Sequence, residues 1–237
     1  GSHLNFVSLC TLYIINSMFS SPLGCFEASL REAILSMSFR PGDILRKPEI
    51  CAQLGVSRSP VSEAVTRLGV EHLVRIVPQT GTYVARFSLA EIREGAFLRE
   101  ALELAAVEKV AQTITDDELT QLRHNLRLQQ ALLDDDDFDG FYQTDAAMHE
   151  LILSFTGYRR VAALAETSWV HVNRARQLIL PAPGRVQSTY AEHQAIFAAI
   201  EARDPVAARA ATRLHLGRLI GFLEPLALAR PDLFEPD

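Results

Sequence analysis

Apolar residues between positions 26 and 56 follow short patterns that change along the chain. One set has the spacing of a helix face: Leu30, Ala33, Ile34 and Met37. The Arg-Pro-Gly-Asp sequence at 40–43 predicts a turn after this helix. Ile50 and Leu54 predict a second short helix, which Gly55 ends.

A third helix and a hairpin follow. Ser57 or Ser59 can serve as the N-cap of this helix, and Pro60 lies in its first turn. Its core-facing residues are Val61, Val65 and Leu68. Two β-branched runs, 74–77 and 82–85, flank turn-forming residues and predict a hairpin. Three helices and a hairpin are the arrangement of a winged helix-turn-helix domain.

From residue 88 onward the pattern is helical, without a convincing strand. The predicted helices lie at about 88–112, 116–134, 138–156, 158–180, 184–202 and 204–229. The predicted fold class is therefore mainly α. An N-terminal winged helix-turn-helix domain at 25–87 is followed by a C-terminal all-α six-helix bundle at 88–230.

The segment 1–24 precedes both domains and contains no charged side chain after an apparent tag remnant at 1–3. A signal peptide would have Lys or Arg before its apolar run, and Asn16 and Ser17 leave the run too short for a membrane span. Three cysteines without metal-type spacing argue for a reducing compartment. We expect a cytoplasmic protein with no membrane segment.

The net charge of −6 is distributed unevenly along the chain. Residues 25–88 contain eight Lys/Arg and six Asp/Glu, whereas residues 89–237 contain 15 and 23. This asymmetry suits a front region that contacts phosphate groups and a back region that does not.

The segment 54–65 has the composition of a turn and a recognition helix. Ser57, Arg58 and Ser59 stand at the helix start, where they can contact phosphates and a guanine edge. An ordinary surface helix could begin in the same way.

Residues 30–86 as a whole resemble the N-terminal domain of the GntR family. The resemblance rests on Pro-Gly-Asp-Ile-Leu at 41–45, Val-Ser-Arg-Ser-Pro-Val at 56–61, Leu-Val at 73–74 and the hairpin at 78–84, in the family's order.

This resemblance implies contact with double-stranded operator DNA through the recognition helix and the hairpin tip. The chain departs from the family at Pro48-Glu49 and at Ser62, where many members carry arginine in these regions. Basic residues nearby can compensate for these departures. The predicted DNA-binding residues are Arg46, Lys47, Ser57, Arg58, Ser59, Arg67, Thr80 and Gly81.

One acidic residue and three histidines are candidates for a metal site. Asp145 and His149 are four residues apart within a predicted helix, so their side chains project from one face. His193 and His215 occupy apolar faces of the last two predicted helices. Such a set suits a divalent transition metal, although each histidine alone could be an ordinary core residue.

Residues 89–223 resemble the ligand-binding domain of the FadR subfamily of GntR regulators, in its shorter, VanR-like branch. The supporting motifs lie at 98–103, 145–149, 192–196 and 203–208, followed by His215-Leu216. The resemblance implies that Asp145, His149, His193 and His215 ligate Zn, Ni or Mn, and that the protein is a homodimer. Tyr158 departs from the family, which usually has asparagine there.

Open coordination positions on such a metal could take a small organic acid. Arg99, Asn173 and Arg176 are the candidate effector-binding residues, with His171 as a further candidate. The arginines could equally form ion pairs with Glu103 or Glu166. Effector binding would shift the population of arrangements in which two recognition helices fit an operator.

We therefore expect a transcription repressor rather than an enzyme. Two alternatives stay open at this point. The metal could be purely structural, without an acid effector, or the site could be that of a metal-dependent hydrolase with Glu192 as a nearby carboxylate.

Overall fold

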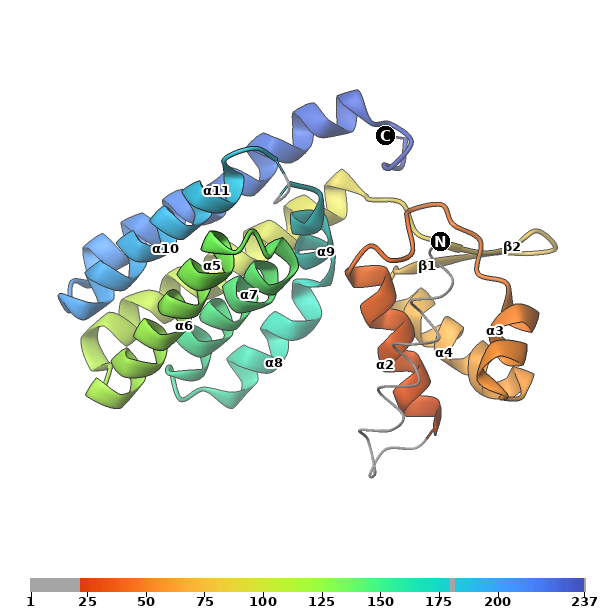
Figure 1. The fold of residues 1–237 in the computed structure, drawn as a ribbon, viewed down its shortest axis with the longest axis horizontal. Coiled ribbons are helices and arrows are strands. Elements are labelled where there is room, and N and C mark those ends of the chain that lie inside the picture. The colour runs from red at the N-terminus through yellow and green to blue at the C-terminus, as the bar shows by residue number, and fades with distance from the viewer. Residues whose placement is uncertain (1–21, 180–181, 237) are drawn as a thin grey trace. The chain divides into compact units, whose positions relative to one another are not determined.

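The computed structural model describes residues 22–179 and 182–236, and these form two compact units (Figure 1). The first unit runs to Ser88 and includes the C-terminal residues from Arg230 onward, and the second spans Leu89–Ala229. Most of the uncharged segment at 1–24 lies outside the described residues. The mainly α fold predicted from the sequence is confirmed.

Three helices form the core of the first unit: α2 (Pro22–Leu35), α3 (Lys47–Leu54) and α4 (Arg58–Val70). Both α2 and α3 pack against α4, which buries Val61, Val65 and Leu68 as predicted. The first helix is shorter than predicted, because it ends at Leu35 and Met37 adopts a φ of 62°. This left-handed conformation turns the chain out of the helix.

The predicted hairpin is confirmed as β1 (Val74–Val77) and β2 (Gly81–Val84), which pair antiparallel with Val74 opposite Val84. Residues 42–45 lie along the other edge of β2, where Leu45 N donates to Thr82 O at 2.8 Å and Val84 N donates to Asp43 O at 2.8 Å. These bonds join the hairpin to the segment that leads into α3.

The C-terminal tail completes the first unit, which the sequence pattern did not indicate. Phe87 N donates to Leu233 O at 2.9 Å, and Glu235 N donates to Phe87 O at 2.8 Å. The rings of Phe87 and Phe234 are 5.6 Å apart, and both side chains are buried. The tail therefore contributes an aromatic residue to the core of the N-terminal unit.

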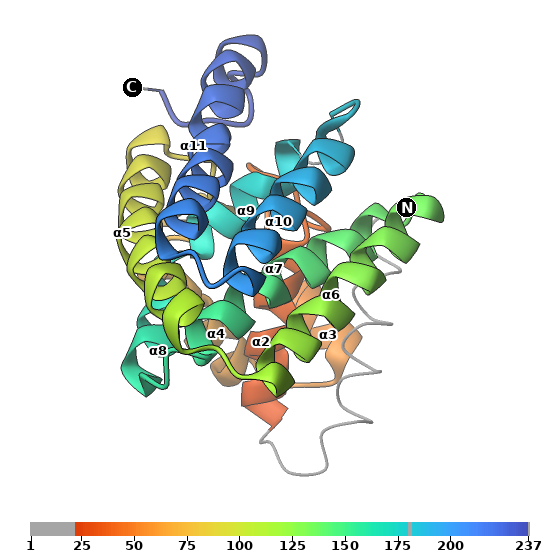
Figure 2. The same cartoon turned by 90° about the vertical axis from the view of Figure 1, so that its left-hand side faces the viewer.

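The second unit is a bundle in which α5 contacts most of the other helices (Figures 1 and 2). Its helices are α5 (Leu89–Thr113), α6 (Asp116–Asp134), α7 (Phe138–Ser154), α8 (Arg159–Ser168), α9 (Val170–Ile179), α10 (Arg185–Glu201) and α11 (Pro205–Ala229). Helix α11 packs along both α5 and α10, and α6 packs against α7. None of the described helices has the length and apolarity needed to cross a membrane.

One predicted helix of this unit is wrong. The segment 158–180 was predicted as a single helix, but it is divided at Trp169 into α8 and α9. Trp169 is buried, and the guanidinium carbon of Arg99 on α5 lies 5.1 Å from its ring centroid. Because the break involves no glycine or proline, the local pattern did not reveal it.

Candidate metal centre and nucleic-acid interface

The four predicted metal ligands come together from three helices of the second unit. Asp145 and His149 lie one turn apart on α7, His193 lies on α10 and His215 on α11. Each offers one ligand atom, and all four atoms lie within 4.8 Å of one another. All four side chains are buried, with exposures from 0% to 6%.

Two of the three imidazoles are oriented by carboxylates. His149 Nδ1 lies 2.5 Å from Glu103 Oε2, and His215 Nδ1 lies 2.8 Å from Glu192 Oε2. Because a carboxylate only accepts hydrogen bonds, each Nδ1 must be the donor. Burial alone would raise the pKa of Glu103, but Arg99 and His149 hold that pKa well below its usual range. Glu103 is therefore an anionic acceptor.

The third imidazole is oriented by a chain of amides. His193 Nδ1 lies 2.8 Å from Gln129 Oε1, whose Nε2 donates to Asn125 Oδ1 at 2.7 Å. Asn125 Nδ2 in turn donates to the backbone oxygen of Thr144 at 2.9 Å. This sequence of donors requires the Gln129 oxygen to accept from His193. Each of the three imidazoles thus places its proton on Nδ1, away from the centre of the cluster.

The remaining imidazole nitrogens face one another or the Asp145 carboxylate as acceptors. His149 Nε2 and His215 Nε2 are 3.2 Å apart, and His193 Nε2 is 3.2 Å from Asp145 Oδ1. Burial, the neighbouring imidazoles and the charges of nearby arginines hold the pKa of His193 and of His215 well below the usual histidine value. The neutral imidazoles therefore direct lone pairs at one another, and a cation between them would relieve that repulsion.

This donor set fits a divalent transition metal on chemical grounds. Neutral imidazole nitrogens and a carboxylate are suitable ligands for Zn, Ni or Mn. Ligating histidines in proteins almost always donate their other ring N–H to a carboxylate, carbonyl or water, as all three do here. Among the described residues, no hydrogen-bond donor reaches His193 Nε2 or Asp145 Oδ1.

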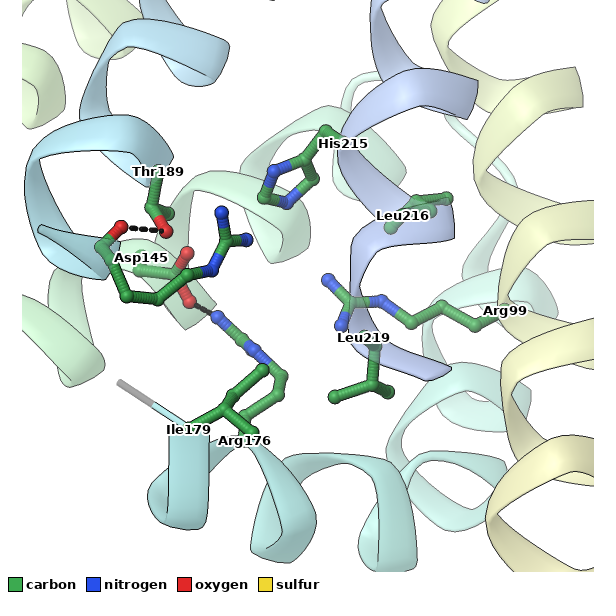
Figure 3. Close-up of a pocket in the computed structure, with 9 residues that line it drawn as sticks. Arg99, Asp145, Arg176, Ile179, Thr189, His215, Leu216 and Leu219 are labelled. Carbon is green, nitrogen blue, oxygen red and sulfur yellow. Dashed lines mark hydrogen bonds and ion pairs between the residues drawn. The ribbon is translucent and has the colours of Figure 1, made fainter. Parts of the chain in front are cut away.

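A small pocket of about 20 Å³ adjoins these ligands (Figure 3). Its lining includes Asp145 and His215 together with three arginines, Arg99, Arg176 and Arg185. A volume of this size holds about one water molecule. Figure 3 shows the Arg99 and Arg176 side chains directed into this region from different helices.

The structure brings two of the three predicted effector-binding residues to the pocket. Arg176 contacts the Asp145 carboxylate, and Arg99 also forms a buried ion pair with Glu103 at 2.5 Å. Asn173 does not line the pocket, but its Oδ1 lies 3.5 Å from Arg176 Nη1. His171 is also absent from the pocket lining, and its Nε2 lies 3.7 Å from Glu91.

Sequence reasoning missed the residues that support the histidines. Glu103 was considered only as an arginine partner, Glu192 only as a possible base, and Gln129 not at all. The Arg99–Glu103 spacing of four residues was the one local signal. Arg185, which pairs with Glu192 at 3.0 Å, was also missed. Because Glu192 binds both Arg185 and His215, it is already occupied as an acceptor.

In the first unit, a groove of about 600 Å³ brings together the start of α3 and the hairpin. Four of the predicted DNA-binding residues line it: Arg46, Lys47, Thr80 and Gly81. Arg46 and Thr80 are exposed. At the hairpin tip, Gln79 adopts a φ of 61°. The groove thus combines two basic side chains with backbone from the hairpin turn.

The predicted recognition residues lie at the start of α4. Ser57 is the N-cap, and its hydroxyl makes no capping hydrogen bond to the helix. Ser57, Arg58 and Ser59 are all exposed. Arg67 lies near the other end of α4, where it pairs with Glu63 at 2.7 Å and Glu27 at 3.0 Å. Arg67 is therefore held by carboxylates, whereas the helix start presents hydroxyls and a guanidinium to a ligand.

Comparison with known proteins identifies both units. Residues 26–84 match the bacterial regulatory proteins of the gntR family, and residues 94–218 match the FCD domain. A helix-turn-helix transcriptional regulator from an unstable DNA locus of Streptomyces ambofaciens is 32% identical over 208 residues, covering 88% of this chain and 87% of the relative. The transcriptional repressor RspR of Escherichia coli K12 is 29% identical, covering 88% of this chain and 91% of RspR.

Solved structures share the same fold. A GntR transcriptional regulator from Rhodococcus sp. RHA1 superposes with a TM-score of 0.76 at 25% identity, covering 87% of this chain and 99% of that one. Escherichia coli McbR/YncC superposes with a TM-score of 0.74 at 22% identity, covering 88% and 99%, and this likeness concerns the fold alone.

Proposed function

The chain belongs to the GntR family as a transcriptional regulator with an FCD ligand-binding domain, and from this premise we propose that it is a repressor controlled by a metal-bound small carboxylate. We assign operator binding to residues 25–87 and effector binding to residues 88–230. The repressor role is supported by the relative RspR, which is a transcriptional repressor.

GntR regulators bind operator DNA, and the start of α4 is the part of this chain best suited to base contacts. We propose that Arg58 contacts a guanine edge and that Ser57 and Ser59 contact phosphates at the helix N-terminus. Arg46, Lys47 and the hairpin tip would follow the adjacent backbone. A homodimer would supply two such surfaces for the two half-sites of an operator.

The observation that carries the proposal is the orientation of the three histidines. Each donates its Nδ1 proton outward to Glu103, Gln129 or Glu192, so that each Nε2 is left as an acceptor beside Asp145. Asp145, His149, His193 and His215 would hold a divalent metal. When bound, such a metal supplies positive charge and open coordination positions for a carboxylate.

The pocket beside the ligands supports an acid as the effector. Arg99 and Arg176 reach it, and guanidinium groups bind carboxylates in a planar, bidentate manner. Because the pocket holds only about 20 Å³, an acid must displace at least one side chain on entering. We propose that this rearrangement shifts the population of the operator-binding state.

Operator binding tests the proposal directly. The full chain would be titrated against its operator with succinate or acetate, before and after chelator treatment and metal restoration. We expect an acid to weaken operator binding only in the metal-loaded protein.

The matched control is His124→Ala, which changes an exposed histidine on α6, and it should behave like the parent chain. Metal content of about one ion per chain without any acid response would favour a structural metal. Turnover of an acid would favour a hydrolase, although Glu192, the carboxylate considered as a possible base, is already paired with Arg185 and His215.

A further inference from the structure

Arg176 lies against a proposed metal ligand. Its guanidinium contacts Asp145 Oδ2, and the two side chains are 7% and 0% exposed (Figure 3). A single carboxylate charge cannot neutralise both a guanidinium and a divalent cation in a buried site. Arg176 and a cation therefore oppose each other at Asp145.

The charges around the pocket balance when no cation is present. Each of the three pocket arginines is paired with one carboxylate: Arg99 with Glu103, Arg176 with Asp145, and Arg185 with Glu192. Because arginine stays protonated in proteins, each of these pairs is neutral. A divalent cation would add two positive charges that nothing in these pairs offsets.

Two of the pocket arginines hold carboxylates that orient imidazoles, and the third does not. Arg99 Nε donates to Glu103, which orients His149, and Arg185 makes two bonds to Glu192, which orients His215. Arg176 orients no imidazole; besides Asp145, it contacts Asn173 Oδ1 at 3.5 Å, and its guanidinium carbon lies 5.3 Å from the Tyr142 ring centroid. It is therefore the arginine that can leave its carboxylate without disturbing a histidine.

Buried donors already point to an anion in this region. Arg99 Nη2 and Arg185 Nε are buried, and no acceptor among the described residues reaches either atom. A buried donor without a partner is costly, so an anion that accepts from these atoms would be stabilised.

We propose that Arg176 is an exchangeable partner of Asp145: it pairs with Asp145 before a cation binds and with the effector afterwards, so that the loaded site selects a dianion. This inference rests on the proposed function, because it concerns the same metal and acid. One carboxylate of the dianion takes the open positions beside the ligands, and the other takes Arg176. Metal and dianion then strengthen each other's binding by the same factor.

Calorimetric titration of the chelator-treated full chain with Zn²⁺ tests this exchange without relying on repression. Without acid, Arg176→Gln should bind Zn²⁺ about tenfold more tightly than the parent. Saturating succinate should tighten Zn²⁺ binding to the parent by about tenfold, and acetate by clearly less. In Arg176→Gln, succinate and acetate should act alike.

Arg176→Lys is the matched control, because it keeps a positive charge at this position and leaves the carboxylates that orient the histidines paired. An equal gain in Zn²⁺ affinity in Arg176→Lys and Arg176→Gln would overturn the exchange, since the loss of the opposing charge would not be its cause. Unchanged affinity in Arg176→Gln would overturn it too.

If Arg176→Gln does not fold, the parent chain alone still tests the proposal. Equal effects of succinate and acetate on its Zn²⁺ affinity would contradict selection of a dianion. If the protein binds Zn²⁺ and acids change its Zn²⁺ affinity equally in the parent and in Arg176→Gln, only the role of Arg176 is contradicted. Failure of any acid to affect either Zn²⁺ or operator binding ends the proposed function as well.

Discussion

The candidate DNA-binding residues lie on the surface of the first unit, whereas the candidate metal and effector residues lie at the centre of the second. Arg58 is exposed at the start of α4, but Arg99 is 5% exposed and enclosed between Glu103 and Trp169. The first unit can present its site without a ligand because water solvates it. The second must satisfy every buried charge internally, so its site is also part of its core.

Removing two candidate metal ligands should produce the largest of the expected effects. His149→Ala combined with His193→Ala leaves two of four ligands, and we expect stoichiometric metal to be lost. Operator binding in the absence of acid should be retained, because the candidate DNA-binding residues lie in the other unit. Elemental analysis measures the metal content and operator titration measures DNA binding, with His124→Ala as the control. Full metal content in the double variant would refute the ligand set.

The buried pair Arg99–Glu103 provides the next largest effect. Glu103→Gln leaves Arg99 as an uncompensated buried charge, and we expect the free energy of unfolding to fall by about 3 kcal/mol. Urea denaturation of the metal-free chain measures it. Glu100→Gln on the same helix is the control, because its pair with Arg213 is largely exposed and should matter by less than about 1 kcal/mol. Equal losses in the two variants would argue against a buried charge network.

The first unit should instead be sensitive to the loss of apolar packing. Phe234→Ala removes the aromatic contact of the C-terminal tail with Phe87, and we expect a loss of about 2 kcal/mol in its stability. Hydrogen exchange of the amides in β1 and β2 would localise the loss to this unit. Pro236→Ala, in the same tail, is the control. Unchanged protection in Phe234→Ala would show that the tail does not support the unit.

The last expected effect concerns DNA binding at the surface of the first unit rather than stability. Arg58→Ala should weaken specific operator binding by about 1–3 kcal/mol and leave the free energy of unfolding nearly unchanged. Arg67→Ala, at the other end of α4, should weaken operator binding less, because Glu27 and Glu63 already hold that guanidinium. Parallel titrations on operator and unrelated DNA separate specific from non-specific binding for both variants. A larger loss for Arg67→Ala would reverse the assignment.

Local sequence patterns predicted most helices and both strands correctly. The core spacing of Val61, Val65 and Leu68 placed α4, and the turn residues at 78–81 placed the hairpin. The errors lie where the chain turns at a residue that is neither glycine nor proline. Met37 leaves the first helix through a left-handed conformation, and Trp169 divides a helical segment while it packs beneath Arg99.

The amino-acid sequence alone predicted the two domain types, the candidate recognition helix and the four candidate metal ligands, because each depends on residues close together or on a recognisable motif. The packing of the helices in the folded chain was needed to find which residues orient the imidazoles and which arginine contacts Asp145. Glu103, Gln129 and Arg176 act on ligands from other helices. Such pairings arise from the packing of whole helices, and residue spacing along the chain carries no record of them.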